Sequence, residues 1–175
     1  MGGVMFCSDA DLSGDSVIFL AHQWNFFPGK QYTPSDFNEK SVTGGTFLTL
    51  GSFGNFSLGS TSEASNGTAT YRLTLSLPDT ARTYSLYLPE IFSAYSLYVD
   101  GVLVGQMGNP DPEHYVERTQ NRMFTFKANI SLEILIAVTD KSSASPGIQS
   151  VPVFGNPLKI NTIRGISVFI NSSVF

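Results

Sequence analysis

The sequence is poor in the residues that form covalent crosslinks and most catalytic or metal sites. Its 175 residues include one cysteine and two histidines. The lone Cys7 excludes an intrachain disulfide and a metal site built from several thiolates. His22 and His114 lie far apart, and no local motif around either is typical of a nucleophile with its base. We therefore expect no enzyme activity, no cofactor and no metal.

Charge is equally scarce. Charged residues make up 14% of the chain, against about 25% in an average soluble domain. Fourteen acidic and ten basic residues give a net charge of −4, and no basic cluster is present to neutralise a row of phosphates. Nucleic acid is thus not an expected partner. The sequence also lacks any run of 18 apolar residues that would predict a membrane-spanning helix.

Alternation of apolar and polar residues runs through the whole chain and predicts β-strands. In "TATYRLTLSL" (68–77), Tyr71 and the alternate leucines after it share one face, and Arg72 lies on the other. "TYSLYLP" (83–89) repeats the pattern, and the Pro-Asp-Thr-Ala linker before it predicts an antiparallel return. In "AYSLYVDGVLVGQ" (94–106), Asp100-Gly101 predicts the turn of a hairpin. Further strands are expected in "VIFLAHQWNFF", "GTFLTLG", "RMFTFKA", "LEILIAVTD", "VPVFG" and "GISVFI".

About nine strands joined by irregular loops indicate an all-β fold, a β-sandwich of the jelly-roll type. One short helix is expected in "TPSDFNEK" (33–40), with Thr33 as N-cap and Pro34 at the first position. We predict a single domain over residues 16–175. Residues 1–15 form an N-terminal segment that is either flexible or not native to the chain.

Aromatic residues offer the best candidates for a binding site, because a flat ring can stack on a sugar. Strand alternation predicts that Tyr87 and Tyr98 share a face with Arg72, and Glu90 follows the neighbouring strand. These four residues contact a ligand, or Arg72 and Glu90 form a structural ion pair. Trp24 either contacts a ligand or packs in the core.

The segment "GNPDPEHYVERTQN" (108–121) is long for a connection and carries His114 and Tyr115, which we expect in the wall of a binding site. Its oxygen ligands could hold calcium, although two prolines fit a stiff exposed turn equally well. Paired carboxylates for glycoside cleavage could come from Glu90 or from the acidic residues of this loop. Solvated or ion-paired carboxylates are the simpler interpretation.

The order of motifs from "QWNFFPGKQYTPSDF" through "YLPEIFSAYSLYVDGVLVGQMG" to "VPVFGNP" resembles the extracellular galactose-binding-like jelly roll of bacterial seven-transmembrane receptors with diverse intracellular signalling modules. The resemblance covers roughly residues 16 to 160. Its most specific part is the run from Gly67 to Gly108. The strand with Tyr71-Arg72 and the hairpin around Asp100-Gly101 also resemble those of sugar-binding jelly rolls in β-galactosidase-like glycosidases. Two loops, "GSFGNFSLG" and "TDKSSASPG", depart from the receptor pattern.

The resemblance implies an extracellular or periplasmic sensor domain, tethered to the membrane by a membrane domain C-terminal to this chain. Its ligand would be a small molecule, plausibly a carbohydrate. Two other hypotheses stay open: an accessory carbohydrate-binding module of a secreted glycosidase, and an interaction domain that pairs with a partner protein or forms a homodimer.

Overall fold

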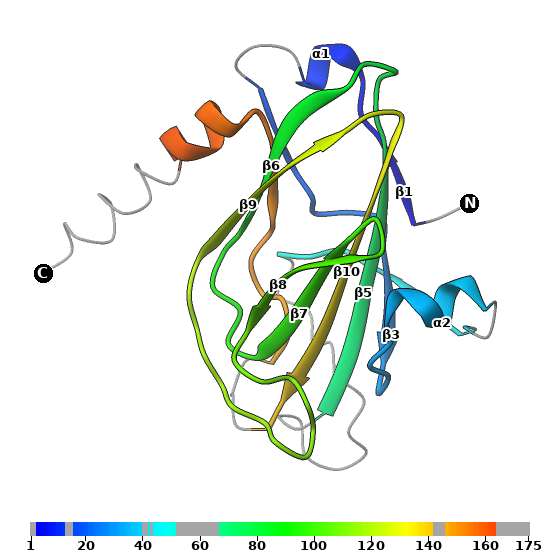
Figure 1. Cartoon of the computed structure of the whole chain (residues 1–175), viewed down its shortest axis with the longest axis vertical. Coiled ribbons are helices and arrows are strands. Elements are labelled where there is room, and N and C mark those ends of the chain that lie inside the picture. The colour runs from blue at the N-terminus through cyan, green and yellow to red at the C-terminus, as the bar shows by residue number, and fades with distance from the viewer. Residues whose placement is uncertain are drawn as a thin grey trace, which may run out of the picture.

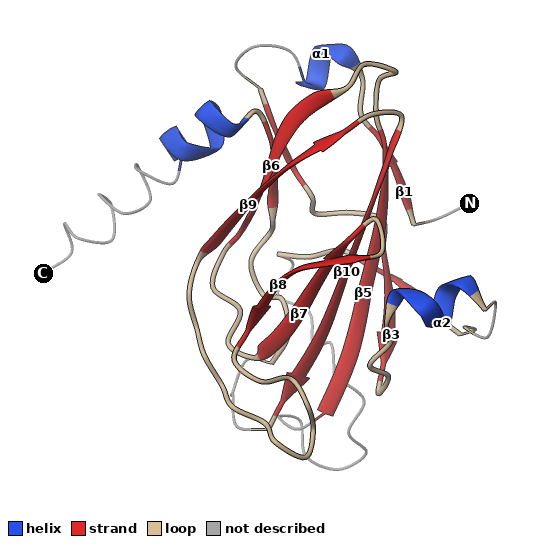
Figure 2. Cartoon of the chain, in the orientation of Figure 1, coloured by secondary structure: helices blue, strands red, loops and turns tan. Residues whose placement is uncertain are grey.

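Alternating residues form β-strands in the computed structural model, which describes residues 3–12, 16–39, 42, 44–51, 67–141 and 146–163. The strands make two sheets, and the helices lie at their periphery (Figures 1 and 2). The strands are β1 (Val4–Phe6), β2 (Val17–Phe19), β3 (Trp24–Pro28), β4 (Thr46–Leu48), β5 (Gly67–Ser76), β6 (Arg82–Leu88), β7 (Ala94–Val99), β8 (Val102–Met107), β9 (Arg122–Ala128), β10 (Ser131–Asp140) and β11 (Val153–Gly155).

The large sheet has the strand order β4-β3-β5-β10-β7-β8, and β1 pairs in parallel with the end of β5. The small sheet has the order β2-β11-β6-β9. All pairs except β1 with β5 are antiparallel. This confirms the predicted all-β sandwich. The core fills the space between the sheets, and its largest fully buried side chains include Trp24, Tyr71, Tyr84, Tyr95 and Phe154.

The predicted hairpin is confirmed in β7 and β8. Asp100 and Gly101 have φ angles of 46° and 79°, the left-handed values that an Asp-Gly turn adopts easily. The side chain of Asp100 also accepts a hydrogen bond from the backbone N–H of Glu133, at 2.7 Å. The turn is thereby tied to β10, its neighbour in the large sheet.

Two predicted strand arrangements were wrong. β5 and β6 do not pair: the linker between them crosses from the large sheet to the small one. The segment 17–27 is not one strand either, because β2 and β3 join different sheets. The chain turns between them at Gln23, whose φ is 68°. Alternation fixes which residues share a face, but it does not reveal which sheet a strand joins.

The described N-terminal residues 3–12 pack as part of the sandwich, whereas the sequence predicted residues 1–15 as a separate segment. β1 pairs with β5, and Cys7 and Leu12 are buried in the core. The short helix α1 (Asp9–Leu12) contains Leu12 and lies between β1 and β2 in the chain. The predicted strand "GISVFI" falls outside the described residues, as does most of the loop 51–67.

The predicted helix is confirmed as α2 (Pro34–Asn38), with Thr33 as its N-cap. A further helical segment spans residues 157–163. Among the helices of the described residues, none is long and apolar enough to cross a membrane.

The outer face of the large sheet is covered by the chain that leads into α2. Thr70 accepts a hydrogen bond from the N–H of Tyr32 and donates one to the carbonyl of Lys30, both at 2.8 Å. The rings of Phe27, Tyr32 and Phe37 pack edge to face above this point. The face predicted to hold a ligand is therefore largely occupied by the protein itself.

Candidate functional site

A pocket of about 410 Å³ lies at the end of the large sheet where β5 begins and β10 ends. Gly67 and Asp140 are paired at this end of the two strands. Pockets of about 300 to 1,000 Å³ are the usual size for small-molecule sites. The residues that line it are Gly67, Thr68, Pro112, Thr139, Asp140 and Lys141.

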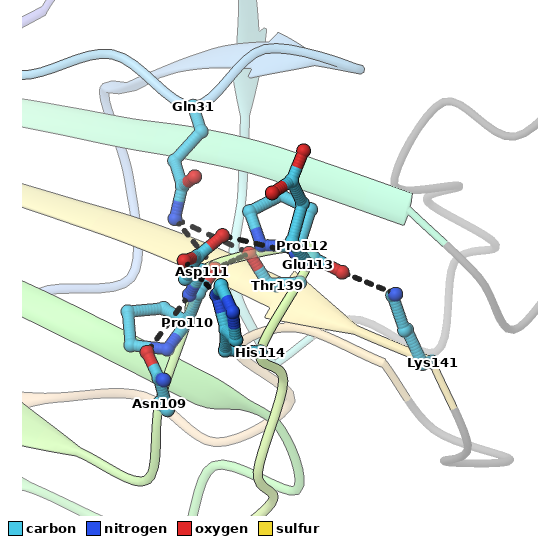
Figure 3. A network of polar contacts seen from close by, with 9 residues as sticks. All are labelled: Gln31, Asn109, Pro110, Asp111, Pro112, Glu113, His114, Thr139 and Lys141. Carbon is cyan, nitrogen blue, oxygen red and sulfur yellow. Dashed lines mark hydrogen bonds and ion pairs between the residues drawn. The ribbon is translucent and has the colours of Figure 1, made fainter.

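One wall of the pocket is the loop that follows β8, and it is pinned to the sheet through a backbone carbonyl. The carbonyl of Pro110 accepts a hydrogen bond from Thr139 Oγ1 at 2.5 Å and another from Gln31 Nε2 at 3.0 Å. Figure 3 shows Gln31, Thr139 and Pro110 converging on this point. Because Thr139 is buried on β10, the loop is held against a rigid strand.

The loop is stiffened internally by Asp111. Its Oδ1 accepts the backbone N–H of Glu113 at 2.9 Å, and its Oδ2 lies 2.7 Å from Nδ1 of His114 (Figure 3). The hydrogen bond with His114, followed by the one from the Glu113 backbone, lowers the pKa of the Asp111 carboxyl. Asn109 Oδ1 in turn accepts the N–H of Asp111 at 3.2 Å. These contacts form a stiff exposed turn, which was the alternative to a calcium-binding loop for this segment.

No group of three or more His, Cys, Asp and Glu side chains is placed to hold a metal ion within the ranges that the structure describes. Both oxygens of Asp111 are engaged within the turn.

Asp140 and Lys141 are adjacent at the end of β10, but the side chain of Asp140 is buried and that of Lys141 is exposed. Asp140 is fully buried and accepts a hydrogen bond from Ser93 Oγ at 2.6 Å. Lys141 is exposed, and its ammonium donates to the carbonyl of Pro112 across the pocket (Figure 3). The pocket thus has a cation at its rim, while the carboxylate of Asp140 is held inside the fold by Ser93.

Arg72 does not reach this pocket and does not pair with Glu90. Its Nε donates to Glu133 Oε2 at 2.8 Å, its Nη2 donates to the same oxygen, and its guanidinium lies 4.5 Å from the ring centre of Phe37. The predicted ion pair between Arg72 and Glu90 was therefore wrong in its partner. Glu90 is exposed, just after β6 in the small sheet.

The predicted grouping of the two tyrosines with Arg72 holds for one of them. Tyr98 and Arg72 flank Leu135 from opposite sides in the register of the large sheet, so the three side chains share its outer face. Tyr87 lies in the small sheet, where it is buried in a cluster with Val153 and Ile160. Placing Tyr87 on the face of Arg72 was wrong because the two strands belong to different sheets.

Trp24 packs in the core and has no exposed surface to offer a ligand. Its exposed fraction is 0%, its indole N–H donates to the carbonyl of Leu20 at 2.7 Å, and its ring meets Tyr71 edge to face. His114 and Tyr115 lie in the loop that walls the pocket. The side chain of His114 is mostly exposed, and Tyr115 is half-buried.

Sequence reasoning missed most of the pocket, namely Thr68, Thr139, Asp140 and Lys141, and also Gln31, which ties the neighbouring loop to the sheet. The available signal was their position, because Asp140 and Lys141 end the most apolar predicted strand and face a loop rich in polar residues. Loops at the ends of a rigid sandwich commonly carry binding residues.

No model of a protein family matches the chain, and no curated protein matches it. Among solved structures, a β-glucuronidase from Faecalibacterium prausnitzii has a TM-score of 0.52 at 11% identity and covers 79% of this chain and 31% of its own. A calcium-binding mutant of Bacteroides uniformis β-glucuronidase 2 has a TM-score of 0.51 at 17% identity, covering 79% of this chain and 18% of its own. A GH2 β-galacturonidase from Eisenbergiella tayi has a TM-score of 0.47 at 14% identity, covering 79% and 24%.

The chain therefore spans less than a third of the length of each of these enzymes. At such low identity the likeness concerns the fold alone. It agrees with the two layers described above, and the chain has a β-sandwich fold.

Proposed function

We propose that the chain is a non-enzymatic ligand-binding domain that takes up a carbohydrate in the pocket at the end of β5 and β10, and that it serves as the extracytoplasmic sensor of a membrane receptor. The observation that supports this most is the pocket itself. It has the volume of a small-molecule site and a mainly apolar lining, with Lys141 at its rim and Thr68 in its wall.

The pocket wall is organised before any ligand arrives. The carbonyl of Pro110 is held by two donors, and Asp111 fixes the turn that follows. A preformed wall reduces the entropy lost on binding, so more of the contact energy contributes to affinity. This favours reversible recognition of a small polar ligand.

A short connection between the pocket and the last described helix supports the sensor role. Asp140 binds Ser93, whose Oγ also accepts the N–H of Gly147 at 3.0 Å. From Gly147 the chain runs to β11 and then to the helical segment 157–163, where Ile160 packs on Tyr87. A ligand that shifts the end of β10 can thus act on the segment that leaves the sandwich.

The test is a binding screen with a variant that fills the pocket. We expect calorimetry or thermal-shift measurements with mono- and disaccharides to find at least one ligand. Thr68→Phe places a ring in the pocket and should abolish binding, whereas Thr83→Phe, on an exposed position of β6, should not. Wild-type protein that binds none of the sugars would overturn the carbohydrate proposal.

The likeness to glycosidase structures supports a second function, an accessory carbohydrate-binding module. Both functions use the same pocket, and they differ in what the gene encodes beside this domain. Seven hydrophobic segments after residue 175 would support the sensor, and an adjoining glycosidase catalytic domain would support the module.

A further inference from the structure

Lys141 is a cation at the pocket rim whose observed contact is with an uncharged acceptor. Its ammonium donates to the backbone carbonyl of Pro112. The ion pairs found among the described residues involve Arg72, Arg82 and His114. Among the described residues no carboxylate lies within ion-pairing distance of Lys141. The carbonyl of Pro112 accepts only one of the three N–H donors of the Lys141 ammonium.

Two nearby carboxylates, Asp140 next to Lys141 in the chain and Asp111 in the facing loop, are engaged elsewhere. Asp140 is buried beneath the rim and binds Ser93. Asp111 accepts the N–H of Glu113 and the ring of His114. Lys141 attracts Asp111 at longer range, but the two form no ion pair. A carboxylate arriving with a ligand would give Lys141 a much stronger acceptor than a carbonyl, because charge-assisted hydrogen bonds are about twice as strong as neutral ones.

We propose that the pocket selects a saccharide that carries a carboxylate, a sugar of the hexuronic acid class, and that Lys141 binds that carboxylate. This rests on the proposed function, since it requires a sugar in the pocket. Thr68 on β5 lines the same cavity and supplies a hydroxyl for the ring. The net charge of −4 opposes an acidic ligand only weakly, because charges beyond about 8 Å are screened at physiological ionic strength.

The experiment compares sugars that differ at one carbon. Glucuronate against glucose, and galacturonate against galactose, exchange a carboxylate for a hydroxymethyl group on the same ring. Calorimetry at low and at physiological salt should show at least one acid binding about tenfold more tightly than its neutral partner, which corresponds to about 1.4 kcal/mol. The preference should shrink as salt is added.

Two lysine variants assign the preference to Lys141. Lys141→Met keeps the length of the side chain and should bring the acid and its neutral partner to within twofold of each other. Lys127→Met removes an exposed lysine from β9 in the other sheet and should leave the tenfold preference intact. Matching melting temperatures and circular dichroism spectra confirm that both variants fold.

Failure of the inference about Lys141 can be distinguished from failure of carbohydrate binding itself. If neutral sugars bind as tightly as the acids, or if Lys141→Met keeps the preference, the inference is overturned while carbohydrate binding stands. If acetate binds as tightly as the uronates, the site recognises any anion and the inference fails. If the wild-type protein binds no sugar of either kind, the proposed function fails and the inference fails with it.

Discussion

Arg72 and Glu133 form an ion pair between adjacent strands of the large sheet, on the outer face of the sandwich. Nε of Arg72 donates at 2.8 Å to Oε2 of Glu133, and Nη2 donates to the same oxygen. The guanidinium also lies over the ring of Phe37 in α2. Two of the five N–H donors of Arg72 and the face of its guanidinium are thus engaged within the fold, which is a structural role.

Replacing Arg72 should therefore change stability and leave ligand binding untouched. Both side chains of the pair are partly exposed, at 34% and 25%, so solvent screens the ion pair. Together with the loss of the contact with Phe37, Arg72→Met should lower the free energy of unfolding by about 1 kcal/mol. Urea denaturation measures the loss. Weakened sugar binding in this variant would show that Arg72 does belong to the site.

Trp24 should report on the core and not on the ligand. Trp24→Phe removes the indole N–H that donates to the carbonyl of Leu20 and leaves a smaller ring. The substitution should cost about 2 to 3 kcal/mol. Trp24 is the sole tryptophan, so fluorescence of the wild-type protein follows it alone. We expect resistance to acrylamide quenching in the folded state and no direct quenching by bound sugar. Strong quenching before unfolding would contradict its burial.

The sequence predicted the strand faces well because alternation is a local property. The hairpin at Asp100-Gly101 and the buried side of β5 both follow from a few neighbouring residues. Pairing between distant strands is not local, and this is why Tyr87 was assigned to the wrong sheet. Glu133 as the partner of Arg72 becomes visible only once β10 lies beside β5.

The pocket was harder still to predict. Lys141 meets Pro112 across 29 positions of sequence, and Gln31 meets Thr139 across 108. No spacing rule connects such residues, since their contacts depend on the order of strands in the sheet. Only the loop that carries His114 and Tyr115 could be identified in advance, from its length and its polar composition.

Tyr95 should make the protein sensitive to alkaline pH. Burial raises its pKa to about 12, whereas the unfolded chain ionises its tyrosines near 10. Below pH 10 both states hold the proton and stability is constant. As the pH rises from about 10 to 12 only the unfolded state loses it, and stability falls by up to about 2 kcal/mol.

The variant Tyr95→Phe isolates this effect. The buried hydroxyl of Tyr95 has no hydrogen-bond partner among the residues that the structure describes, so its removal should cost little at pH 7. Urea titrations between pH 8 and 11 should show a smaller decline for the variant than for the wild type. Other titrating groups contribute equally to both curves and cancel in their difference. One of them is Cys7, where burial raises the thiol pKa to about 11. Identical curves would refute the assignment.

Gly105 and Phe124 close one side of the sandwich, where β8 of the large sheet meets β9 of the small one. A Cβ added at Gly105 would lie 2.3 Å from Cε1 and 2.7 Å from Cζ of Phe124. Gly105→Ala should therefore cost about 1 to 3 kcal/mol. Adding Phe124→Leu should recover part of this loss in a double-mutant cycle. Additive losses would mean that the two residues are not in contact.

The sequence Asp140-Lys141 at the end of β10 affects which strand register forms during folding. β10 lies between β5 and β7, and Asp140 places its carboxylate inside the fold where Ser93 receives it. A slip of one residue would turn Lys141 inward, with its ammonium facing the Ser93 hydroxyl, and would remove Leu132, Ile134, Ile136 and Val138 from the core. The pair Asp140-Lys141 therefore helps to specify the register of β10, because only the observed register buries Asp140 beside Ser93 and leaves Lys141 in solvent.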